Sequence, residues 1–240
     1  MGHYLIVGAH GGIGEAIARR LAGAGHSLHL ASRNADGVAA LAQELSAGHS
    51  VCDVTDDGQI EAVVAAAGDD LSGLVYAVGT INLKPLGKLT ADDFLNDFNL
   101  NALAAVKVIQ HALPALKAGD GGSVLLFSTI AVQQGFAAHA SVSMAKGAVE
   151  GLVRALGTEL APKVRVNAIA PSLIDTPLAK PMTGSEQMAK AIAAMHAVPR
   201  LGLAEDIAPM AELLLTDQGG WISGQVIGID GGRSRLRTKG

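Results

Sequence analysis

The sequence predicts an α/β protein built on a doubly wound parallel sheet of seven strands, with helices on both faces. Short apolar runs alternate with longer segments whose apolar residues recur at helical spacing, which is the pattern of repeated β-α units. A glycine-rich turn, from Gly8 to Gly14, directly follows the first apolar run. The length of 240 residues suits one such unit, so we expect a single domain over residues 1–240.

The elements follow this alternation in order. The expected strands are residues 4–7, 27–31, 50–52, 73–77, 123–127, 165–168 and 226–229. The expected helices are residues 13–24, 38–45, 59–67, 91–116, 143–160, 186–195 and 205–215. Loops after the carboxyl ends of the strands form the ligand crevice of such sheets. The less regular segment at about 174–200, which contains three prolines, is therefore the expected substrate lid.

Composition narrows the class of protein. Hydrophobic residues make up 49% of the chain and there are 30 glycines, which fits a buried sheet rather than disorder. The net charge of −4 gives no general attraction to nucleic acid or to an anionic membrane. The lone Cys52 has no internal disulfide partner, and no apolar run approaches the roughly 20 residues of a membrane helix. We expect a soluble cytoplasmic protein that binds a small-molecule substrate, with no nucleic acid, membrane or metal site.

The glycine-rich turn predicts dinucleotide binding. Gly8, Gly12 and Gly14 let the backbone turn tightly and approach a pyrophosphate, and the helix that begins near Ile13 offers free N–H groups to the phosphates. The turn could be only a strand-helix connection. Its place between an apolar strand and an amphipathic helix favours the dinucleotide.

The end of the second strand indicates which dinucleotide binds. An acidic residue there would contact the adenine ribose hydroxyls and select NAD, whereas this chain has Ser32 followed by Arg33. A guanidinium can hold a 2′-phosphate, so NADP is favoured, with NAD as the alternative. An ordinary solvated loop arginine is the other interpretation of Arg33.

Several motifs, in this order, resemble those of the short-chain dehydrogenase/reductase family. They are Gly8-x-x-x-Gly12-x-Gly14, the strand ending at Gly79, the lysine of Ser143-Met144-Ala145-Lys146, Val166-Asn167 with Pro171, and Asp230-Gly231-Gly232. The similarity extends from Tyr4 to Gly232. It implies a Rossmann-like fold, an NAD(P)-dependent oxidoreductase, and a homo-oligomer, tetramer or dimer, built on two long helices. Apolar faces that include Ala102, Ala105, Ala148 and Leu152 are compatible with that assembly.

The resemblance also implies which residues bind the cofactor. Asp53 and Val54 match the segment that contacts adenine, although Asp53 could instead cap a helix, as could Thr55 or Asp56. Gly79 would lie beside the cofactor. Pro171, Ser172 and Thr176 would line the nicotinamide, with Ser172 in place of the family's glycine. Tyr76 and Ala77 stand where the family has two asparagines, and we interpret Tyr76 and Tyr4 as structural.

The family's catalytic motif is only partly present. It reads Tyr-x-x-x-Lys, and this chain has Val142 where the tyrosine would donate and accept a proton. Lys146 is then expected to bind the nicotinamide ribose. Asn99 matches the asparagine that bends its helix and holds a relay water, with Asn101 as the alternative register. Thr129, thirteen residues before Val142, would orient a substrate carbonyl, with Ser128 as its alternative.

His139 is the leading candidate to replace the missing proton donor. It lies seven residues before Lys146, which is the tyrosine-to-lysine spacing of the related enoyl reductases. A histidine titrates near neutrality and can act as a general acid. A water held by Lys146 and Asn99 is the other source, and His139 could also be a polar surface residue. Ser141 and Ser143 are expected to point away from the face of Val142.

Two functions follow from these residues. The first is an NADP(H)-dependent oxidoreductase acting on a small carbonyl, alcohol or enone, with an atypical proton donor. The second is a catalytically silent NADP(H)-binding scaffold, sensor or partner subunit. We favour the enzyme because the relay implied for Asn99 serves only proton movement. Four basic residues near the C-terminus are expected to form a solvated tail or subunit contact: Arg233, Arg235, Arg237 and Lys239.

Overall fold

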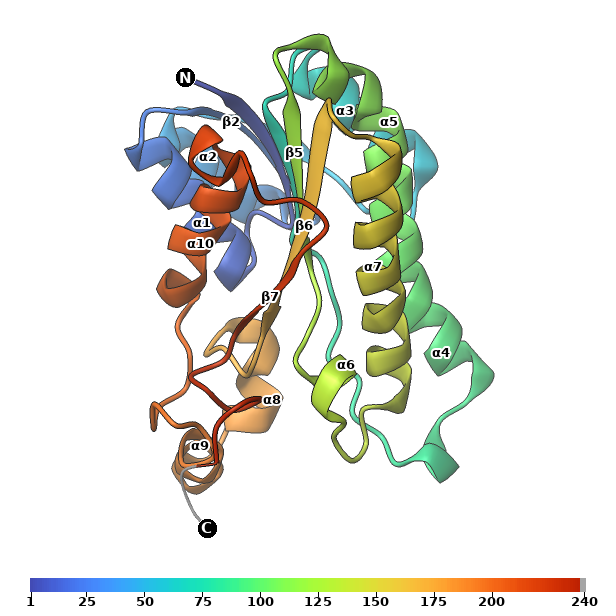
Figure 1. Ribbon diagram of the computed structural model, residues 1–240, viewed down its shortest axis with the longest axis vertical. Coiled ribbons are helices and arrows are strands. Elements are labelled where there is room, and N and C mark those ends of the chain that lie inside the picture. Colours follow the sequence, from blue (N-terminus) through green and yellow to red (C-terminus); the bar gives the residue numbers. More distant parts are fainter. Residues whose placement is uncertain (238–240) are drawn as a thin grey trace.

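The computed structural model describes residues 1–237 and contains one seven-stranded, all-parallel sheet (Figure 1). Its strand order is β3-β2-β1-β4-β5-β6-β7, which confirms the predicted doubly wound fold. Lys239 lies outside the described residues. The strands are β1 (His3–Val7), β2 (Ser27–Ser32), β3 (Gly48–Val51), β4 (Gly73–Tyr76), β5 (Gly122–Phe127), β6 (Val164–Pro171) and β7 (Val226–Ile229).

Helices cover both faces of this sheet (Figure 1). One face carries α1 (Gly12–Gly23), α2 (Ala35–Leu45) and α10 (Ala204–Leu215), and the other carries α3 (Asp57–Ala67), α5 (Ala104–Ala118) and α7 (Ala140–Glu159). Side chains of a strand alternate between the two faces. In β1, Tyr4 and Ile6 therefore pack with α1, whereas Leu5 and Val7 pack with α3 and α5.

The long helix expected at 91–116 is interrupted. It consists of α4 (Ala91–Phe98), a π-helical turn η2 (Asn99–Leu103) and then α5. A Thr90–Asp93 capping box starts α4. Tyr76 at the end of β4 donates a 2.7 Å hydrogen bond from its hydroxyl to the Leu100 carbonyl, which holds the π-helical turn against the sheet. Such turns occur frequently at functional sites.

Two of the residues assigned to an oligomer surface face the interior instead. Ala102 is 4% exposed and Ala105 is 0% exposed, because both side chains pack into the core between the sheet and its α3–α5–α7 face. Ala148 and Leu152 are only partly buried against the same core. The first two residues therefore give no support to the predicted interface.

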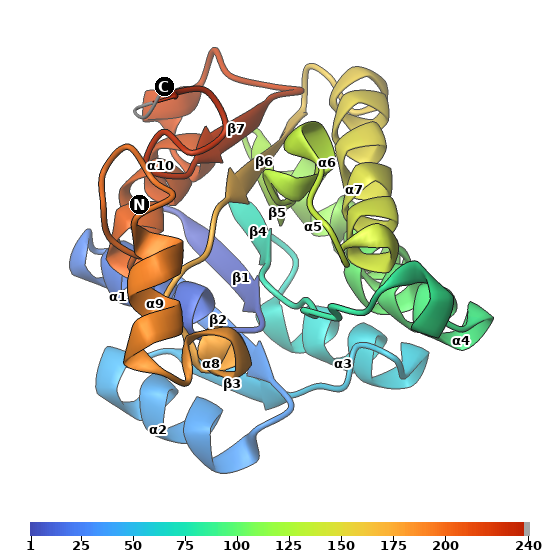
Figure 2. The same cartoon turned by 90° about the horizontal axis from the view of Figure 1, so that it is seen from below.

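Two connections shape the end of the sheet where the strands finish. The first, between β5 and α7, contains a short helix α6 (Ala131–Gln134) that the sequence pattern did not reveal. The second follows β6 and contains η3 (Pro177–Ala179), α8 (Lys180–Thr183) and α9 (Glu186–Ala193), in the place of the expected lid. Figure 2 views this end and shows α8 and α9 in front of the strands.

The remaining elements are a 3-10 turn η1 (Leu86–Lys88) before α4 and another, η4 (Asp217–Gly219), after α10. No helix within residues 1–237 is both long enough and apolar enough to cross a membrane.

Candidate active site

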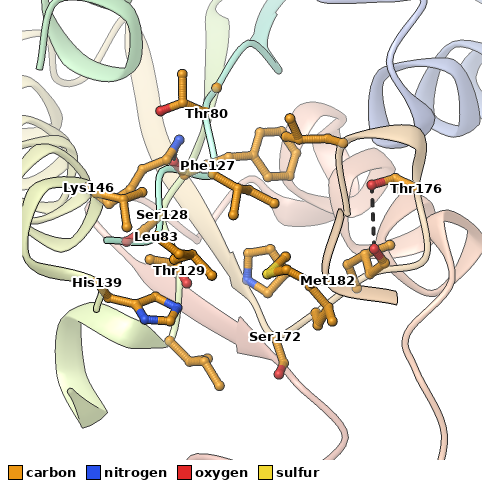
Figure 3. Close-up of a pocket in the computed structure, with 18 of the residues that line it drawn as sticks. Thr80, Leu83, Phe127, Ser128, Thr129, His139, Lys146, Ser172, Thr176 and Met182 are labelled. Atoms are coloured by element: carbon orange, nitrogen blue, oxygen red, sulfur yellow. Dashed lines mark hydrogen bonds between the residues drawn. The ribbon is translucent and has the colours of Figure 1, made fainter. Parts of the chain in front are cut away.

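A cavity of about 430 Å³ opens at the carboxyl ends of β4, β5 and β6. Strand ends form its floor, the segment between β5 and α7 forms one wall, and the lid covers it with leucine, isoleucine and methionine side chains (Figure 3). Most of the lining is apolar. The polar and charged lining side chains are those of Thr80, Ser128, Thr129, His139, Lys146, Ser172, Thr176 and Arg233.

Lys146 provides the buried charge of the cavity. It projects from α7 and its Nζ donates a 2.9 Å hydrogen bond to the Phe127 carbonyl at the end of β5. Burial lowers the pKa of Lys146 from 10.5 to about 8, although the nearby Asp97 carboxylate acts in the opposite direction. The amine is therefore close to its titration point at physiological pH.

Asn101, and not Asn99, lies beside Lys146. A Cβ on Gly79 would lie 3.0 Å from Asn101 Oδ1 and 3.3 Å from Lys146 Nζ, so the bare backbone of Gly79 separates these two side chains. Asn99 is exposed and does not line the cavity. The alternative register, Asn101, is therefore the asparagine that lies near Lys146, because the π-helical turn changes which side chains face the sheet.

Asn101 belongs to a buried polar cluster with Thr80 and Asp97. The Asn101 amide donates 2.8 Å hydrogen bonds to Thr80 Oγ1 and to the Asp97 carbonyl. Thr80 Oγ1 in turn donates to Asp97 Oδ1 at 2.7 Å. Asp97 is 2% exposed, and its Oδ2 accepts no hydrogen bond from the described residues. The cluster fixes Asn101 and places the Asp97 carboxylate close enough to raise the pKa of Lys146.

The α7 face that looks into the cavity is apolar. Val142 is 6% exposed and lines the cavity one helical turn before Lys146. Ser141 and Ser143 do not line it, as expected; the Ser143 hydroxyl donates to the Ala131 carbonyl at 3.3 Å. Neither tyrosine reaches the cavity, since Tyr4 and Tyr76 are buried within the sheet layers. Val142 therefore lines this wall of the cavity, and α7 contributes no hydroxyl group beside it.

Thr129 carries the available hydroxyl at the end of β5. Ser128 also borders the cavity, but its hydroxyl donates a 2.8 Å hydrogen bond to the buried Glu150 carboxylate on α7. The Thr129 oxygen makes only a long 3.3 Å contact, accepting from the Ala131 N–H. Of the two alternatives, Thr129 is the one with a free hydroxyl proton.

His139 lines the cavity at the start of α7, on the same side as Thr129 (Figure 3). Its Nδ1 donates a 2.7 Å hydrogen bond to the Ala137 carbonyl, since a carbonyl can only accept. The ring also packs edge-on against Phe136 with centroids 5.4 Å apart. These two contacts fix the imidazole and leave Nε2 for a ligand.

The glycine turn has the form of a phosphate cradle. Gly8 adopts φ +89°, and its N–H donates to the Ala31 carbonyl at 2.8 Å, which ties the turn to the end of β2. Gly11 precedes α1 without any side-chain cap, so the first N–H groups of the helix keep their hydrogen-bonding capacity. Gly14 packs on the Gly8 carbonyl, and Gly12 packs on the Thr176 methyl group. At Gly14 the neighbour is backbone, so a larger residue would not fit there, which agrees with a turn shaped for a dinucleotide.

The predicted adenine-side residues gather at neighbouring strand ends. Ser32 ends β2, Arg33 is exposed beside it, and the Cys52 N–H donates to the Ser32 carbonyl at 3.0 Å. Asp53 does not cap α3, because Asp56 does so. Asp53 Oδ1 accepts from the N–H and hydroxyl of Thr55 at 2.9 and 2.8 Å. Those hydrogen bonds, with a smaller contribution from Arg33, lower the pKa of Asp53.

Five other predicted cofactor-binding residues line the cavity: Ile13, Gly79, Pro171, Ser172 and Thr176. Val54 is buried in the core. The Ser172 hydroxyl is 2.8 Å from His196 Nε2. His196 Nδ1 donates to the Ile192 carbonyl at 2.9 Å, so in the neutral ring Nε2 accepts from Ser172. The predicted cofactor residues therefore form one continuous edge from β3 to β6.

Several residues of the site were not identified from the sequence, among them Thr80, Asp97, Phe136 and Arg233. Phe136 belongs to the unpredicted segment after α6, and Arg233 was assigned to a solvated tail. The aspartate and glycines that precede Arg233 were recognised as a motif, and their position after the last strand could have placed this arginine at the cavity.

Fold and site together define a nucleotide-binding oxidoreductase of the α/β class. Residues 8–234 match the family model described as enoyl-(acyl carrier protein) reductase. A tropinone reductase homologue of Arabidopsis thaliana is 33% identical over 238 residues, which cover 95% of this chain and 91% of the relative. The chain belongs to the short-chain dehydrogenase/reductase family, a family of oxidoreductase enzymes.

Solved structures agree with this assignment. A short-chain type dehydrogenase/reductase from Mycobacterium ulcerans is 31% identical with a TM-score of 0.92, over 98% of this chain and 90% of that one. The actinorhodin polyketide ketoreductase, solved with NADPH, is 26% identical with a TM-score of 0.93, over 98% of both chains.

Proposed function

We propose that this protein is an NADP(H)-dependent oxidoreductase that acts on an apolar carbonyl, alcohol or enone, with His139 as the proton donor. One observation carries the proposal: Lys146, Thr129 and His139 converge on a single apolar cavity in which α7 contributes Val142. The NADPH in the related ketoreductase structure and the exposed Arg33 support NADP over NAD.

The cofactor's place follows from the cradle. Its pyrophosphate would lie on the turn from Gly8 to Gly14, a 2′-phosphate would meet Ser32 and Arg33, and the nicotinamide would lie against Pro171, Ser172 and Thr176. Asp53 and Val54 would border the adenine. When bound, NADPH supplies the hydride.

Lys146 has two tasks in this scheme. Its ammonium group binds the nicotinamide ribose and adds positive charge where a substrate oxygen becomes negative. The Phe127 carbonyl orients the amine, and the cluster of Asn101, Thr80 and Asp97 stabilises its protonated form. Asn101 takes the relay role that the sequence assigned to Asn99.

Thr129 and His139 act on the substrate oxygen and supply the proton. Thr129 donates a hydrogen bond that orients the substrate carbonyl. His139, with Nδ1 fixed on Ala137, delivers a proton from Nε2 of its imidazolium form. The lid excludes water with its apolar side chains, which strengthens both interactions.

The silent scaffold is the second candidate, because α7 presents valine where a proton donor is expected. The two functions separate in one experiment: titrate NADPH by fluorescence, then follow NADPH oxidation with a panel of carbonyls and enones. We expect binding and turnover of at least one member. Binding without turnover across the panel would favour the scaffold, and failure to bind NADPH would contradict both functions.

Replacing Asp97 by asparagine should shift the pH dependence of the enzyme. Lys146 is cationic below its pKa of about 8, so NADPH affinity and turnover should fall as the pH rises through that value. The Asp97 charge raises the Lys146 pKa, and Asp97→Asn should therefore move this loss to lower pH. The measurement is kcat/KM and NADPH Kd from pH 6 to 10, with the exposed Asp92→Asn on the same helix as control. Identical profiles for all three proteins would contradict the assigned role of Asp97.

Gly8→Ala should weaken both the fold and cofactor binding. A Cβ there would lie 2.8 Å from the Ala77 carbonyl carbon on a backbone with φ +89°, which costs about 1–3 kcal/mol. Thermal unfolding and NADPH titration report the two effects, and we expect at least about a 10-fold loss of affinity as the turn moves. Gly23→Ala, where a Cβ meets nothing within 4 Å, should leave both unchanged or slightly raise stability. Wild-type NADPH affinity in Gly8→Ala would argue against the cradle.

A further inference from the structure

Arg233 is the second cation of the cavity, and no carboxylate within residues 1–237 forms an ion pair with it. It follows the Asp230-Gly231-Gly232 turn after β7, and its side chain reaches the cavity wall. Its guanidinium carbon lies 4.6 Å above the centroid of the Phe136 ring, which is a cation-π contact. None of the ion pairs within residues 1–237 includes Arg233.

The nearest acid is engaged elsewhere. Asp230 Oδ1 accepts from the Gly232 N–H and Oδ2 accepts from the Ser234 N–H, both at 2.9 Å. The carboxylate thus fixes the turn, with Gly231 and Gly232 at positive φ, and does not reach the guanidinium as an ion-pair partner. Asp230 affects Arg233 only through a longer-range electrostatic interaction, which raises the Arg233 pKa.

The two neighbours of the guanidinium are weak partners. Nη1 is 3.4 Å from Ser172 Oγ and Nη2 is 3.4 Å from Met195 Sδ. The Ser172 hydroxyl proton points to His196, so its lone pairs face Arg233. An arginine carries five N–H donors in a planar fork, and most of them stay unused here. Burial lowers the pKa of Arg233, which is the cost of holding this cation without a counter-ion.

The backbone of this arginine is held in place. Gln134 at the end of α6 donates a 3.3 Å hydrogen bond from its side-chain amide to the Arg233 carbonyl. A Cβ on Gly232 would lie 2.9 Å from Ala197 Cβ, so the turn packs closely on the lid. The Gln134 hydrogen bond and the packing of Gly232 on the lid therefore hold Arg233 at the cavity, whereas Arg235, two residues later, is exposed.

Phe136 connects Arg233 to the proposed proton donor. The same ring contacts the guanidinium and, edge-on, the His139 imidazole. A planar anion bound by the Arg233 guanidinium would therefore be separated from the proposed proton donor, His139, by the Phe136 ring. The rest of the cavity offers methionine, leucine and isoleucine side chains to the body of a ligand.

We propose that Arg233 binds a carboxylate of the substrate, and that the substrate is an apolar organic acid that also carries the carbonyl or conjugated alkene. This inference rests on the proposed function and names its substrate class. Arginine binds carboxylates through two parallel hydrogen bonds, which a lysine cannot reproduce. The carboxylate enters the fork while the apolar body fills the space beneath the lid.

The test uses the purified protein with saturating NADPH and a panel of aliphatic and aromatic oxo acids and enoic acids, each compared with its own methyl ester. We expect each acid that fits to bind and react about 10- to 100-fold better than its ester, the loss expected for one charged hydrogen-bonded pair. Arg233→Gln should remove this preference, mainly through KM, while leaving the affinity for the neutral esters and for NADPH within about 3-fold. Arg233→Lys should retain part of the preference, because the charge remains without the fork.

Arg235→Gln is the matched control, since Arg235 is exposed and, within residues 1–237, its side chain hydrogen-bonds only to the Gln133 side chain, at 3.3 Å. It should keep the full acid preference. Equal binding of acids and esters by the wild type would overturn the inference, as would an acid preference that persists in Arg233→Gln. An alkyl phosphate that binds more tightly than the carboxylate of equal length would overturn the assignment to carboxylates.

Calorimetry separates this inference from the proposed function. If no member of the panel is reduced, the oxidoreductase proposal fails, and the acid-over-ester difference in Kd still decides the role of Arg233. If the wild type turns over each acid and its methyl ester with equal efficiency, the oxidoreductase stands and the carboxylate site fails.

Discussion

Lys146→Met should lower kcat/KM by about 100-fold or more and weaken NADPH binding by about 10- to 100-fold. In the proposed mechanism the side chain supplies a charge-assisted hydrogen bond to the ribose, worth about 1.5–3 kcal/mol. It also stabilises negative charge that develops on the substrate oxygen, and this second effect appears only in turnover. Its position between the Phe127 carbonyl and the Asn101 cluster leaves no other amine in the described cavity to replace it.

Steady-state kinetics and NADPH titration measure the two losses separately. Lys107→Met is the control, because Lys107 pairs with Asp57 on the surface of α5 and does not line the cavity. Circular dichroism on both variants confirms that the fold persists. Wild-type turnover by Lys146→Met would refute the catalytic geometry proposed above.

His139→Ala should lower kcat/KM by about 10²- to 10⁴-fold, the usual contribution of a positioned general acid. NADPH affinity should stay within about 2-fold, because His139 lies on the substrate side of the cavity. His111→Ala, an exposed histidine on α5, should match the wild type in every measurement.

Rescue makes the role of His139 specific. Imidazole added to His139→Ala should restore part of the activity if the ring acts as an acid, and should do nothing if the ring only packs against Phe136. Unchanged activity in His139→Ala would exclude His139 as the donor and leave a water held near Lys146 as the source.

The fold was predictable because the apolar runs and the glycine turn of the sequence indicate the same structure. All seven strands lie within a few residues of their expected positions, since a parallel sheet buried on both faces needs continuous apolar runs. The Gly8 turn was equally clear, because positive φ and close backbone contacts restrict that position to glycine. The ends of β3 and β6 were less accurate, since pairing with neighbouring strands sets them.

The sequence could not show which of two asparagines lies beside Lys146. Asn99 and Asn101 both lie in a helical pattern, and only the π-helical turn decides which one faces the sheet. The choice between Ser128 and Thr129 needed the Glu150 side chain, which lies 22 residues away along the chain. Both distinctions depend on contacts across the core.

Arg233 shows why surface residues are hard to assign. In the sequence it is one of several basic residues near the end of the chain, and a solvated tail explains such a cluster equally well. Its function depends on the turn fixed by Asp230 and on Phe136, which lies about a hundred residues earlier. For Ala102 and Ala105 the error was the opposite, since core residues were assigned to an oligomer surface. When a helix has apolar residues on two faces, the sequence does not show which face packs against the chain's own core.

The central claim is that this chain transfers a hydride despite the apolar α7 wall at Val142. The most direct measurement uses NADPH with both C4 hydrogens of the nicotinamide replaced by deuterium, incubated with the oxo-acid and enoic-acid panel, followed by mass spectrometry of the products. We expect a product that contains one deuterium from the cofactor, formed by the wild type and lost in Lys146→Met. No deuterium in any product, together with tight NADPH binding, would contradict the claim and support the silent scaffold.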